Sequence, residues 1–511
     1  MLELKNVNIK LSVNDRPIIE NLNFTLHKGD KAVIIGEEGN GKSTLLRLIY
    51  DEELVLDYCQ YSGKIIKKGK IAYLPQSFPD KELDKSVAEY FAETEPHHYI
   101  QILSRLGLTL DFLASSQRIH TLSGGEKIKI QLAKILMSQP DIIMLDEPTN
   151  DIDLEVLNWL EEFIKICEQP LLYISHDETL IENTANIIIH IEQLIRKTKS
   201  KITVTKSGYT DYVKARNLAF NKQMQVARKQ RSDHKAQMEK WQQVYNKVDH
   251  EQRAISRQNP SGGRLLKKKM KSVKSTGKRL ENQADDFLEI PETEESILTQ
   301  FSLEISIPQG KEILSLDLPG LYVNEKQLSG SIALNVNGSE HIGIIGHNGV
   351  GKSTLLRVIW ALLKNRKDIQ AAYMPQDYTE VLDYNQSVIE FLSTDSHKDT
   401  ITKVRTYLGS MKFTHEEMLG KISRLSGGQK AKILFLDMVL KGANVLILDE
   451  PTRNFSPLSA PEIRRTLASF GGAIISISHD RKYLADVCEK IYMLTANGLN
   501  YTASTEKKKK S

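Results

Sequence analysis

Two glycine-rich segments that end in lysine and serine are the parts of this sequence best suited to chemistry. Residues 36–44 read GEEGNGKST, and residues 346–354 read GHNGVGKST. Glycines at this spacing let backbone N–H groups close around phosphate oxygens at the start of a helix, where the helix dipole also favours an anion. The lysine then reaches the outer phosphates of a nucleotide, and the serine hydroxyl contacts its magnesium ion. Each segment therefore predicts a site for a nucleoside triphosphate.

Four further motifs follow each segment in the same order. They are a glutamine behind a strand, a Leu-Ser-Gly-Gly sequence, an Asp-Glu-Pro-Thr sequence and a Ser-His-Asp sequence. Ser123 lies 23 residues before Asp146, and Ser426 lies 23 residues before Asp449; the next interval, to the histidine, is 30 residues in both halves. A single glycine-rich turn arises by chance, but five ordered motifs in duplicate indicate an internal repeat of one domain.

The context of these motifs is that of an α/β domain. Residues 31–35 and 341–345 are apolar runs that predict strands, and residues 42–50 and 352–360 predict the helices that follow the glycine-rich loops. Two more apolar runs, 142–145 and 445–448, predict buried parallel strands that deliver Asp146 and Asp449 to a metal ion. The adjacent Glu147 and Glu450 are placed to polarise a water molecule for attack on the γ-phosphate.

Length and composition predict two such domains and a connector. For 511 residues we expect one ATPase domain at 1–205, a linker at 206–290, a second ATPase domain at 291–503 and a basic tail at 504–511. The three cysteines form no CxxC pair, which favours a reducing, cytoplasmic setting. The N-terminus lacks the pattern of a signal peptide, and no apolar run reaches the ~18 residues of a spanning helix, so we expect no membrane domain.

Together, the signature sequence, the glutamine, the Asp-Glu pair and the histidine resemble those of the ABC ATPases over nearly all of the chain except its middle. The resemblance implies that the two domains of one monomer pair head to tail, with each ATP and its Mg²⁺ between the glycine-rich loop of one half and the signature of the other. It implies that nucleotide contacts in the first site come from Gly36, Gly39, Gly41, Lys42, Ser43, Thr44 and Gln76 with Ser426 and Gly428, and in the second from Gly346, Gly349, Gly351, Lys352, Ser353, Thr354 and Gln376 with Ser123 and Gly125. The implied metal ligands are Ser43, Gln76 and Asp146, and Ser353, Gln376 and Asp449; the implied catalytic residues are Glu147 with His176, and Glu450 with His479.

Two fused ABC domains joined by a long charged segment resemble the ABC-F translation factors. Residues 450–459 of the second half read EPTRNFSPLS, which is similar to the Lsa- and Vga-type ribosomal protection proteins. Ser456 stands where the first half has Asp153, so we expect the two sites to be unequal. The two sites also differ at the position about 25 residues before each loop, where an aromatic ring could stack on adenine. This position is near Tyr322 in the second half but is Leu11 in the first, and leucine cannot stack as an aromatic ring does.

The middle of the chain is strongly basic. Residues 206–290 hold 20 Lys and Arg against nine Asp and Glu, a net charge of +11 in a chain whose total is +4. Such an excess indicates a polyanionic partner, most simply nucleic acid, because binding to phosphates releases counterions. The alternative is a solvated helix face, but a face of that kind tends to balance its signs.

The same segment predicts an antiparallel pair of helices. Met238, Trp241, Tyr245 and Val248 form one apolar seam, Leu266, Met270, Val273 and Leu280 form another, and residues 258–263 predict the turn between them. At ~1.5 Å per residue, helices of about 25 to 45 residues would extend ~40 to 65 Å. We expect the tryptophan and tyrosine rings to pack in the seam, and RNA to be bound near the tip by Arg253, Arg257, Arg264, Lys267, Lys268, Lys269 and Lys271.

In the ABC-F family this linker enters the ribosomal exit site. The resemblance therefore implies the 70S ribosome as partner, with 23S rRNA and the exit-site tRNA in contact, and displacement of antibiotics such as lincosamides, streptogramin A or pleuromutilins from the peptidyl-transferase centre. A housekeeping ABC-F translation factor and the ATPase subunit of a drug exporter are the alternatives. An exporter subunit would give the basic linker no role.

Overall fold

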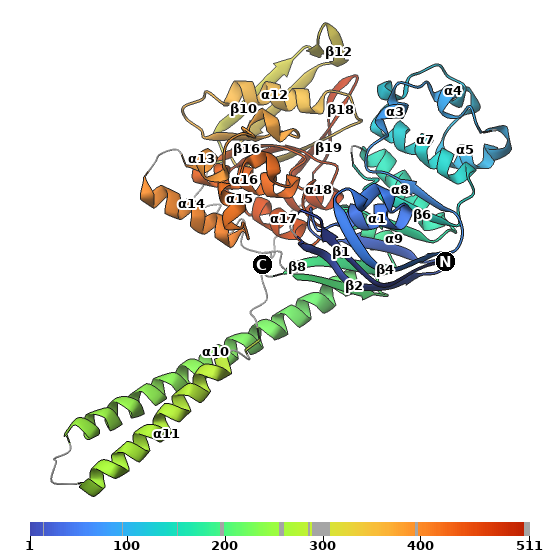
Figure 1. Ribbon diagram of the computed structural model, residues 1–511. Coiled ribbons are helices and arrows are strands. Elements are labelled where there is room, and N and C mark those ends of the chain that lie inside the picture. Colours follow the sequence, from blue (N-terminus) through green and yellow to red (C-terminus); the bar gives the residue numbers. More distant parts are fainter. Residues whose placement is uncertain are drawn as a thin grey trace. The chain divides into compact units, whose positions relative to one another are not determined.

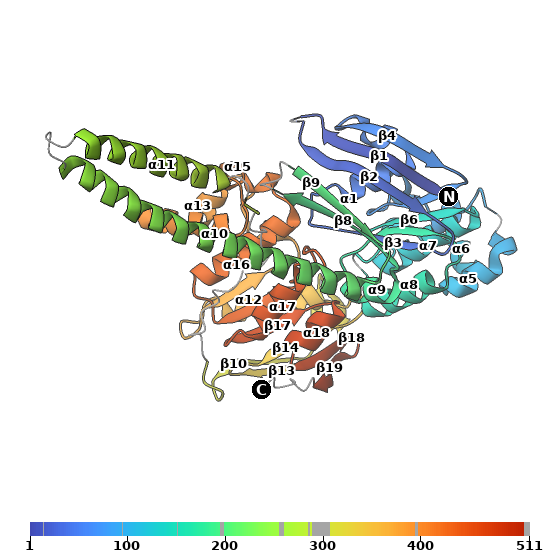
Figure 2. The same cartoon turned by 90° about the horizontal axis from the view of Figure 1, so that it is seen from below.

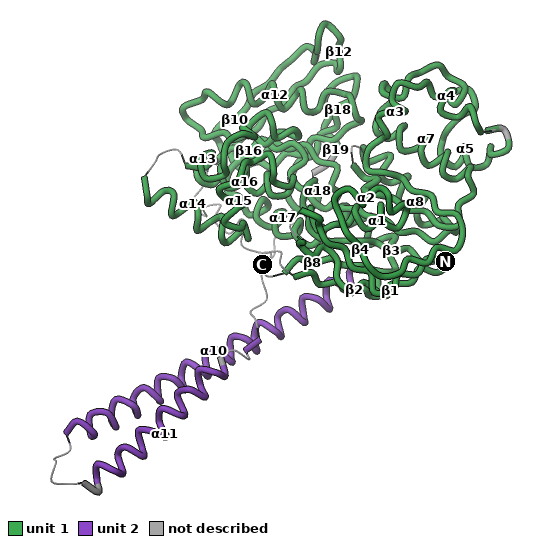
Figure 3. The backbone as a smooth tube through the Cα atoms, viewed as in Figure 1, with its two compact units in different colours: residues 1–209, 294–511 green, residues 210–293 purple. Residues whose placement is uncertain are grey.

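The computed structural model describes residues 1–13, 15–94, 96–150, 152–194, 199–254, 260–284, 287–288, 307–393 and 397–504. The chain divides into two compact units, which Figure 3 distinguishes by colour. One unit comprises residues 1–209 and 294–511, and the other comprises residues 210–293. Among the described residues, no helix combines the length and apolar character needed to span a bilayer.

Each half of the larger unit is built on a six-stranded sheet. In the first half the strand order is β5-β6-β7-β3-β8-β9, and in the second it is β15-β16-β17-β14-β18-β19. Figure 1 shows both halves and labels β6 and β8 of the first sheet and β16, β18 and β19 of the second. The last strand of each sheet runs antiparallel to its neighbour, and the other pairs are parallel. The strands of the first sheet are β3 (Lys31–Ile35), β5 (Ile71–Leu74), β6 (Ile142–Asp146), β7 (Leu171–Ile174), β8 (Ile187–Leu194) and β9 (Lys199–Thr205); those of the second are β14 (His341–Ile345), β15 (Ala371–Met374), β16 (Val445–Asp449), β17 (Ala473–Ile477), β18 (Lys490–Thr495) and β19 (Gly498–Ser504). The identical order confirms the duplicated α/β fold.

Antiparallel strands complete each half. β1 (Leu2–Leu11) lies between β2 (Pro17–Leu26) and β4 (Cys59–Lys67), while β10 (Glu312–Leu318) pairs with β13 (Ile332–Asn337) and β11 (Leu321–Val323) with β12 (Lys326–Ser329). Alternating buried and exposed residues on β1 and β13 leave one face of each strand for the core. In the first half this face shares an apolar core with Leu45 and Ile49 of the helix behind the glycine-rich loop. This helix therefore packs against residues of both sheets of the first half.

The glycine-rich loops run directly into helices α1 (Lys42–Tyr50) and α12 (Lys352–Leu363), as predicted. The signature sequences begin α7 (Gly124–Met137) and α16 (Gly427–Leu440). The remaining helices of the first half are α2 (Glu53–Leu56), α3 (Asp80–Leu83), α4 (Val87–Tyr90), α5 (Ile100–Leu106), α6 (Leu110–Leu113), α8 (Leu154–Ile166) and α9 (Glu178–Thr184); those of the second are α13 (Val388–Leu392), α14 (Lys398–Ser410), α15 (His415–Leu419), α17 (Ala460–Ala468) and α18 (Arg481–Val487).

The smaller unit is a helical hairpin of α10 (Tyr209–Ala254) and α11 (Pro260–Ala284), apart from the first residue of α10. All eight predicted seam residues are buried or half-buried. The indole Nε1 of Trp241 donates to the carbonyl of Val273 at 2.8 Å, and a Cβ atom on Gly277 would lie 2.6 Å from the Trp241 ring. The seam and the packing role of Trp241 are confirmed.

The predicted turn at residues 258–263 is wrong in its second part. Residues 260–263 form the first turn of α11, with Pro260 as its first residue. Proline suits that position because the first N–H groups of a helix have no intrahelical partner and its fixed φ is already helical. Gln258 and Asn259, together with Arg257, lie outside the described residues, as does the tail beyond Ser504.

Ion pairs join the two halves of the larger unit, with acidic groups on the first half and basic groups on the second. Arg464 binds Glu178 through two nitrogens, at 2.8 and 3.2 Å, and both side chains are nearly fully buried. Lys482 adds a contact to Glu178 at 3.0 Å, and Arg481 lies 2.7 Å from Glu161. These residues belong to α8, α9, α17 and α18, of which α9 and α18 contact each other (Figure 2). The pairing of the halves therefore depends on a buried charged layer.

We expect Arg464→Met to lower the free energy of unfolding by about 3 kcal/mol, because it leaves the buried Glu178 carboxylate with a weaker set of partners. The measurement is the midpoint of urea unfolding. Arg465→Met is the matched control, since this neighbouring arginine is largely exposed and pairs with Glu462 of its own helix; its effect should stay below about 0.5 kcal/mol. Equal midpoints for the two variants would contradict the assignment.

Candidate functional site

The first glycine-rich loop closes around its own lysine. Lys42 Nζ donates to the carbonyl oxygens of Gly36, at 2.9 Å, and Glu37, at 3.1 Å. Burial lowers the pKa of Lys42. A Cβ atom at Gly36 would lie 2.4 Å from the carbonyl oxygen of Ile191, so this position with its φ of 149° requires glycine. The loop is thus tightly supported, and its buried cation donates to carbonyl groups of the loop itself.

Asp146, at the end of β6, is held by two hydroxyl groups. Ser43 Oγ donates to Asp146 Oδ1 and Tyr73 Oη donates to Oδ2, both at 2.8 Å. Burial raises the pKa of Asp146. Tyr73 is not among the site residues predicted from the sequence. Its position directly before the Leu-Pro-Gln sequence is the feature that could have indicated it. A serine and an aspartate at this spacing could hold a divalent cation between them.

Glu147 follows in a left-handed conformation, with φ of 50°. Its carboxylate accepts from Gln76 Nε2 at 2.8 Å and from Asn150 Nδ2 at 2.7 Å, and lies 3.3 Å from His176 Nε2. Such a backbone is costly for a glutamate and is characteristic of functional positions. The structure therefore brings together the glutamine, glutamate and histidine that the sequence singled out.

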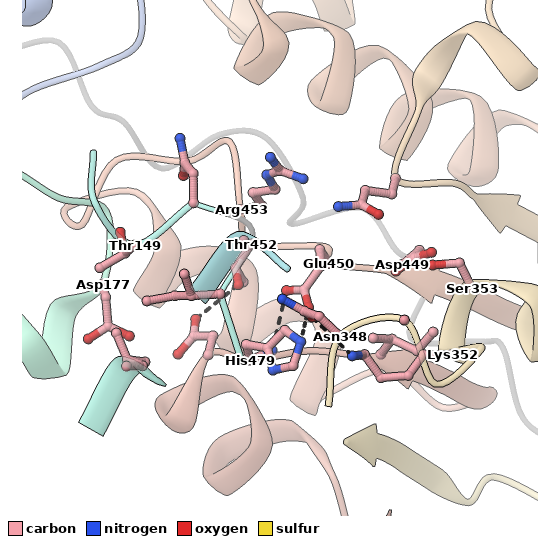
Figure 4. Close-up of a pocket in the computed structure, with 18 of the residues that line it drawn as sticks. Thr149, Asp177, Asn348, Lys352, Ser353, Asp449, Glu450, Thr452, Arg453 and His479 are labelled. Atoms are coloured by element: carbon pink, nitrogen blue, oxygen red, sulfur yellow. Dashed lines mark hydrogen bonds and ion pairs between the residues drawn. The ribbon is translucent and has the colours of Figure 1, made fainter. Parts of the chain in front are cut away.

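The second loop has the same arrangement (Figure 4). Lys352 Nζ donates to the carbonyl oxygens of Gly346, at 2.7 Å, and His347, at 3.0 Å, and lies 3.4 Å from Asn348 Oδ1. Ser353 points toward Asp449, and Glu450 lies between that aspartate and His479. The φ of Glu450 is 51°, as in the first half. The backbone plan of the two sites is therefore shared.

The pKa values of Glu147 and Glu450 are shifted in opposite directions. Although burial raises the pKa of Glu147, the hydrogen bond and charge of His176 and the charge of Lys42 hold it at about 2. Burial and the charge of Asp449 instead raise the pKa of Glu450 to about 8. Burial, and then the charge of Lys352, lower the pKa of His479 to about 4. The surroundings thus favour the charged form of Glu147 and the protonated form of Glu450.

Residues of both halves line each of two cavities. The first cavity, of about 820 Å³, contains Lys42, Ser43, Thr44, Gln76 and Glu147 together with Gly427 and Lys430 of the other half. The second, of about 500 Å³, contains Lys352, Ser353, Thr354, Glu450 and His479 together with Gly124 of the first half. The residues that line both are Asn150, His176, Ser353, Gln376, Asp449 and Arg453. Both volumes are in the range of small-molecule and cofactor sites.

Further contacts join the two halves. His176 Nδ1 donates to the carbonyl of Phe455 at 2.9 Å, and His347 Nδ1 lies 3.3 Å from Asp153 Oδ2. The backbone N–H of Gly428 donates to Glu38 Oε2 at 2.5 Å. A carboxylate from one glycine-rich loop therefore occupies the N-terminus of the opposite signature helix.

The Glu38 contact shows what the site can bind. The N-terminus of α16 takes an anion, as the helix dipole favours, and Glu38 supplies the charge that a phosphate group would bring. Near the second loop, the described side chains leave three buried atoms without a hydrogen-bond partner: Asp449 Oδ2, Glu450 Oε1 and His479 Nδ1. The residues present therefore fit a nucleoside triphosphate with a divalent cation.

The signature serines act locally. Ser123 and Ser426 each cap their own helix by accepting the N–H three residues on, at Glu126 and Gln429. A Cβ atom at Gly125 would lie 2.6 Å from Val156 in the same half. The structure thus brings Gly428 to the opposite half through a hydrogen bond, while the two serines contribute the geometry of the helix start.

The predicted RNA-binding side chains lie on the hairpin. Arg264, Lys267, Lys268, Lys269 and Lys271 are all exposed on α11. Arg253 is exposed on α10, where it pairs with Asp249 at 2.8 Å, and Lys269 lies 3.7 Å from Glu251. Arg257 lies outside the described residues.

Glu38→Asn should strengthen ATP binding at the first site about fivefold, because it removes a negative charge from the phosphate-binding loop and frees the Gly428 N–H group. Asparagine is the residue that the second loop has at this place, Asn348. Titration with a fluorescent ATP analogue, in a Lys352→Ala background that disables the second site, measures the change. Glu52→Asn, at an exposed glutamate outside both cavities, is the control. Weaker binding by Glu38→Asn would contradict this account.

Comparison with known families supports this geometry. The family model described as "ABC transporter" matches residues 19–150 and 330–453, which is half of the chain and includes both glycine-rich loops. Two curated relatives match almost the whole chain. "ATP-binding protein Uup" of Buchnera aphidicola subsp. Schizaphis graminum is 29% identical over 96% of this chain and 81% of its own length. "Ribosome protection protein VmlR" of Bacillus subtilis is 28% identical over 96% of this chain and 86% of its own.

Solved structures show the same fold. The archaeal ribosome recycling factor aABCE1, in complex with the ribosomal stalk protein aP1, superposes with a TM-score of 0.58 at 16% identity, over 97% of this chain and 89% of that one. A structure named RNase-L Inhibitor gives a TM-score of 0.57 at 16% identity, over 98% of this chain and 91% of that one. These structures confirm two tandem ABC ATPase domains. A further curated relative, "ABC transporter F family member 5" of Arabidopsis thaliana, is 25% identical over 96% of this chain and 74% of its own length. By the family model and these relatives, the chain belongs to the ABC transporter family, as an ATPase of its ABC-F branch.

Proposed function

We propose that this chain is an ATP-dependent factor that binds the ribosome and displaces antibiotics from the peptidyl-transferase centre. The observation that carries the proposal is the unbalanced charge of the hairpin. Its segment has a net charge of +11, and most lysines of α11 nearest the tip are exposed rather than buried in ion pairs. Exposed cations in such excess are suited to the phosphates of rRNA and tRNA. The proposed partner is a 70S ribosome, which would place the protein in the cytoplasm.

The relatives add support of their own. The one named a ribosome protection protein aligns with 96% of this chain, so that alignment includes the hairpin as well as the ATPase halves. The solved structures with the same fold include one of ribosome-bound archaeal Pelota and ABCE1. Those names describe other proteins. We infer ribosome binding by this chain from the charge of its own hairpin.

ATP would act as a clamp between the halves. Lys42 and Lys352 would hold the outer phosphates, and the N-termini of α16 and α7 would bind the γ-phosphate from the opposite half. Ser43 with Asp146, and Ser353 with Asp449, would hold Mg²⁺, assisted by Gln76 and Gln376. The ion would neutralise charge that develops on the phosphates. Glu147 and Glu450 would orient the attacking water, with His176 and His479 beside them.

The antibiotic role rests on a narrower feature. Residues 450–459 depart from the sequence of the first half, and in that stretch Ser456 and Ser459 are buried with their hydroxyl oxygens 2.9 Å apart. This arrangement is part of the loop whose Phe455 carbonyl accepts from His176. The proposal is that the departure belongs to a factor specialised for resistance rather than for general translation.

Replacing both catalytic glutamates, Glu147→Gln with Glu450→Gln, should slow ATP hydrolysis at least about 100-fold while leaving ATP bound. A clamp that cannot open would then stay on the ribosome. Co-sedimentation with 70S ribosomes in the presence of ATP measures this. The control is Lys42→Ala with Lys352→Ala, which should neither bind ATP nor sediment. Recovery of the glutamine variant free of ribosomes would refute the ribosomal role.

Neutralising the tip should separate RNA binding from catalysis. Changing Lys267, Lys268, Lys269 and Lys271 to glutamine should reduce the slope of log affinity against log salt by about 3, because each lost phosphate contact lowers it by somewhat less than one. Drug protection in cells should fall with it, while ATPase activity without ribosomes stays as in the wild type. The matched control removes the same charge from lysines earlier in α10, at Lys214, Lys222, Lys229 and Lys235.

The same experiment distinguishes the alternatives. Unchanged drug susceptibility together with impaired ribosome binding would indicate a general translation factor. An unchanged salt slope would argue against nucleic acid as the partner of the hairpin. Drug efflux in intact cells that depends on the two lysines of the ATPase sites but not on the tip would instead favour an exporter subunit.

A further inference from the structure

We propose that Tyr384 of the second half, supported by Lys430, is the platform on which the nucleobase stacks in the first cavity. The inference rests on the proposed pairing of both halves around ATP and adds a base-binding residue to it. The ligand class is a nucleoside triphosphate. The platform would be supplied by the half opposite to the one that binds the phosphates.

The first half offers no ring of its own for this purpose. Among the described residues that line the first cavity, those of the first half include Leu11, Arg16 and Ile18, and none is a phenylalanine, tyrosine or tryptophan. Leu11 and Ile18 also pack against the core of that half. They form an aliphatic wall at the end of β1 and the start of β2. Such a wall can contact one face of a base but gives no aromatic stacking.

The second half places a tyrosine at the same cavity. Tyr384 lines it, and its backbone carbonyl accepts from the N–H of Ser423, three residues before the signature serine Ser426. Its ring is half-buried against the core of the second half. Lys430 Nζ lies 4.3 Å from the centre of that ring. The ring is therefore fixed next to the signature helix, because both its backbone and its face have partners.

A second tyrosine at the cavity is less suitable. Tyr378 is only 6% exposed, and its hydroxyl accepts a hydrogen bond from Asn454 Nδ2 at 2.8 Å. It serves as a wall of the cavity rather than as a surface open to a ligand. Tyr384 is the more accessible of the two.

The second cavity has no equivalent among the residues described for it. The carbonyl of Lys85 accepts from Ile119 as the carbonyl of Gln386 accepts from Ile422, which aligns the two loops. Two residues before Gln386 is Tyr384; two residues before Lys85 is Leu83. No phenylalanine, tyrosine or tryptophan occurs among the described residues that line the second cavity. Tyr322 lies on β11 with 54% of its surface exposed, outside that lining.

The chemistry of the pair matches a nucleotide. An aromatic ring stacks with any base, and removing such a ring typically weakens binding by a factor of about ten or more per base. The ammonium group of Lys430 beside the ring is attracted to the anionic part of the same ligand. With Leu11 and Ile18 on the opposite wall, the base would lie between an aliphatic surface and an aromatic one.

Calorimetric titrations of the full chain with MgATP and with magnesium tripolyphosphate, which has no base, test this proposal. A Lys352→Ala background confines binding to the first cavity. Tyr384→Ala should weaken ATP binding about tenfold and leave tripolyphosphate binding unchanged, while Tyr384→Phe should keep both affinities. Tyr407→Ala is the matched control, since Tyr407 also packs half-buried against the same core, with Lys403 near its ring, but does not line the cavity.

Three results would overturn the proposal. Unchanged ATP affinity in Tyr384→Ala would exclude stacking on this ring. Equal losses for ATP and tripolyphosphate, or an equal loss in Tyr407→Ala, would assign Tyr384 to packing alone. If the Lys352→Ala chain bound neither ligand, the proposed first site itself would fail, and that result is separate from the failure of Tyr384 as its platform. None of these outcomes depends on ribosome binding, which is measured independently.

Discussion

The charged layer between the halves is the interaction on which both cavities depend. Each cavity needs a glycine-rich loop from one half and a signature helix from the other, so the halves must meet in one orientation. Arg464 and Lys482 approach Glu178, and in the ion pairs that cross between these helices the acids come from α8 and α9 and the bases from α17 and α18. Segregated charges favour the pairing of a first half with a second half and disfavour two like halves. Such pairs contribute to orientation more than to net stability.

The two glycine-rich loops differ in charge, and each charge is complementary to the residues that the loop faces in the opposite half. The residue after the first glycine is Glu37 in one loop and His347 in the other. His347 lies against Asp153 of the first half, whereas the second half has Ser456 in place of that aspartate, and Glu37 lies 3.8 Å from Lys432. An aspartate at 456 would bring a further negative charge toward a half whose loop already holds two glutamates. The serine is therefore consistent with the acidic first loop, and it gives a physical reason for the departure seen in residues 450–459.

Local sequence patterns predicted most of the fold, because strands, glycine-rich loops and helix seams are specified by residues that are close together in the sequence. The strands that end at Asp146 and Asp449, the loops before Lys42 and Lys352, and the apolar seam of the hairpin all follow from such patterns. Contacts between the halves do not, since Glu38 and Gly428 are 390 residues apart and nothing in either motif specifies the partner. The predicted turn before α11 extends too far because Pro260 and its glycines are typical of turns, yet proline also begins helices. The hydrogen bond of Tyr73 to Asp146, 73 residues further along the chain, and the proposed role of Tyr384 likewise depend on residues distant in the sequence.

The hairpin is stabilised differently from the ATPase halves. Its core is a single seam, so most of each helix surface faces water, and side chains on that surface are free to carry charge without a cost in packing. Trp241 packs where Gly277 leaves room for it, which lets the two helices approach closely without a second apolar layer. A rod stabilised in this way keeps its shape through the seam alone, and its lysines need not pair with one another. The attraction of these exposed lysines for a distant anion is therefore screened by salt. The ion pairs between the ATPase halves are buried, so salt screens them far less. The proposed binding of the hairpin to RNA should therefore weaken at a lower ionic strength than the proposed ATP-driven closure of the halves.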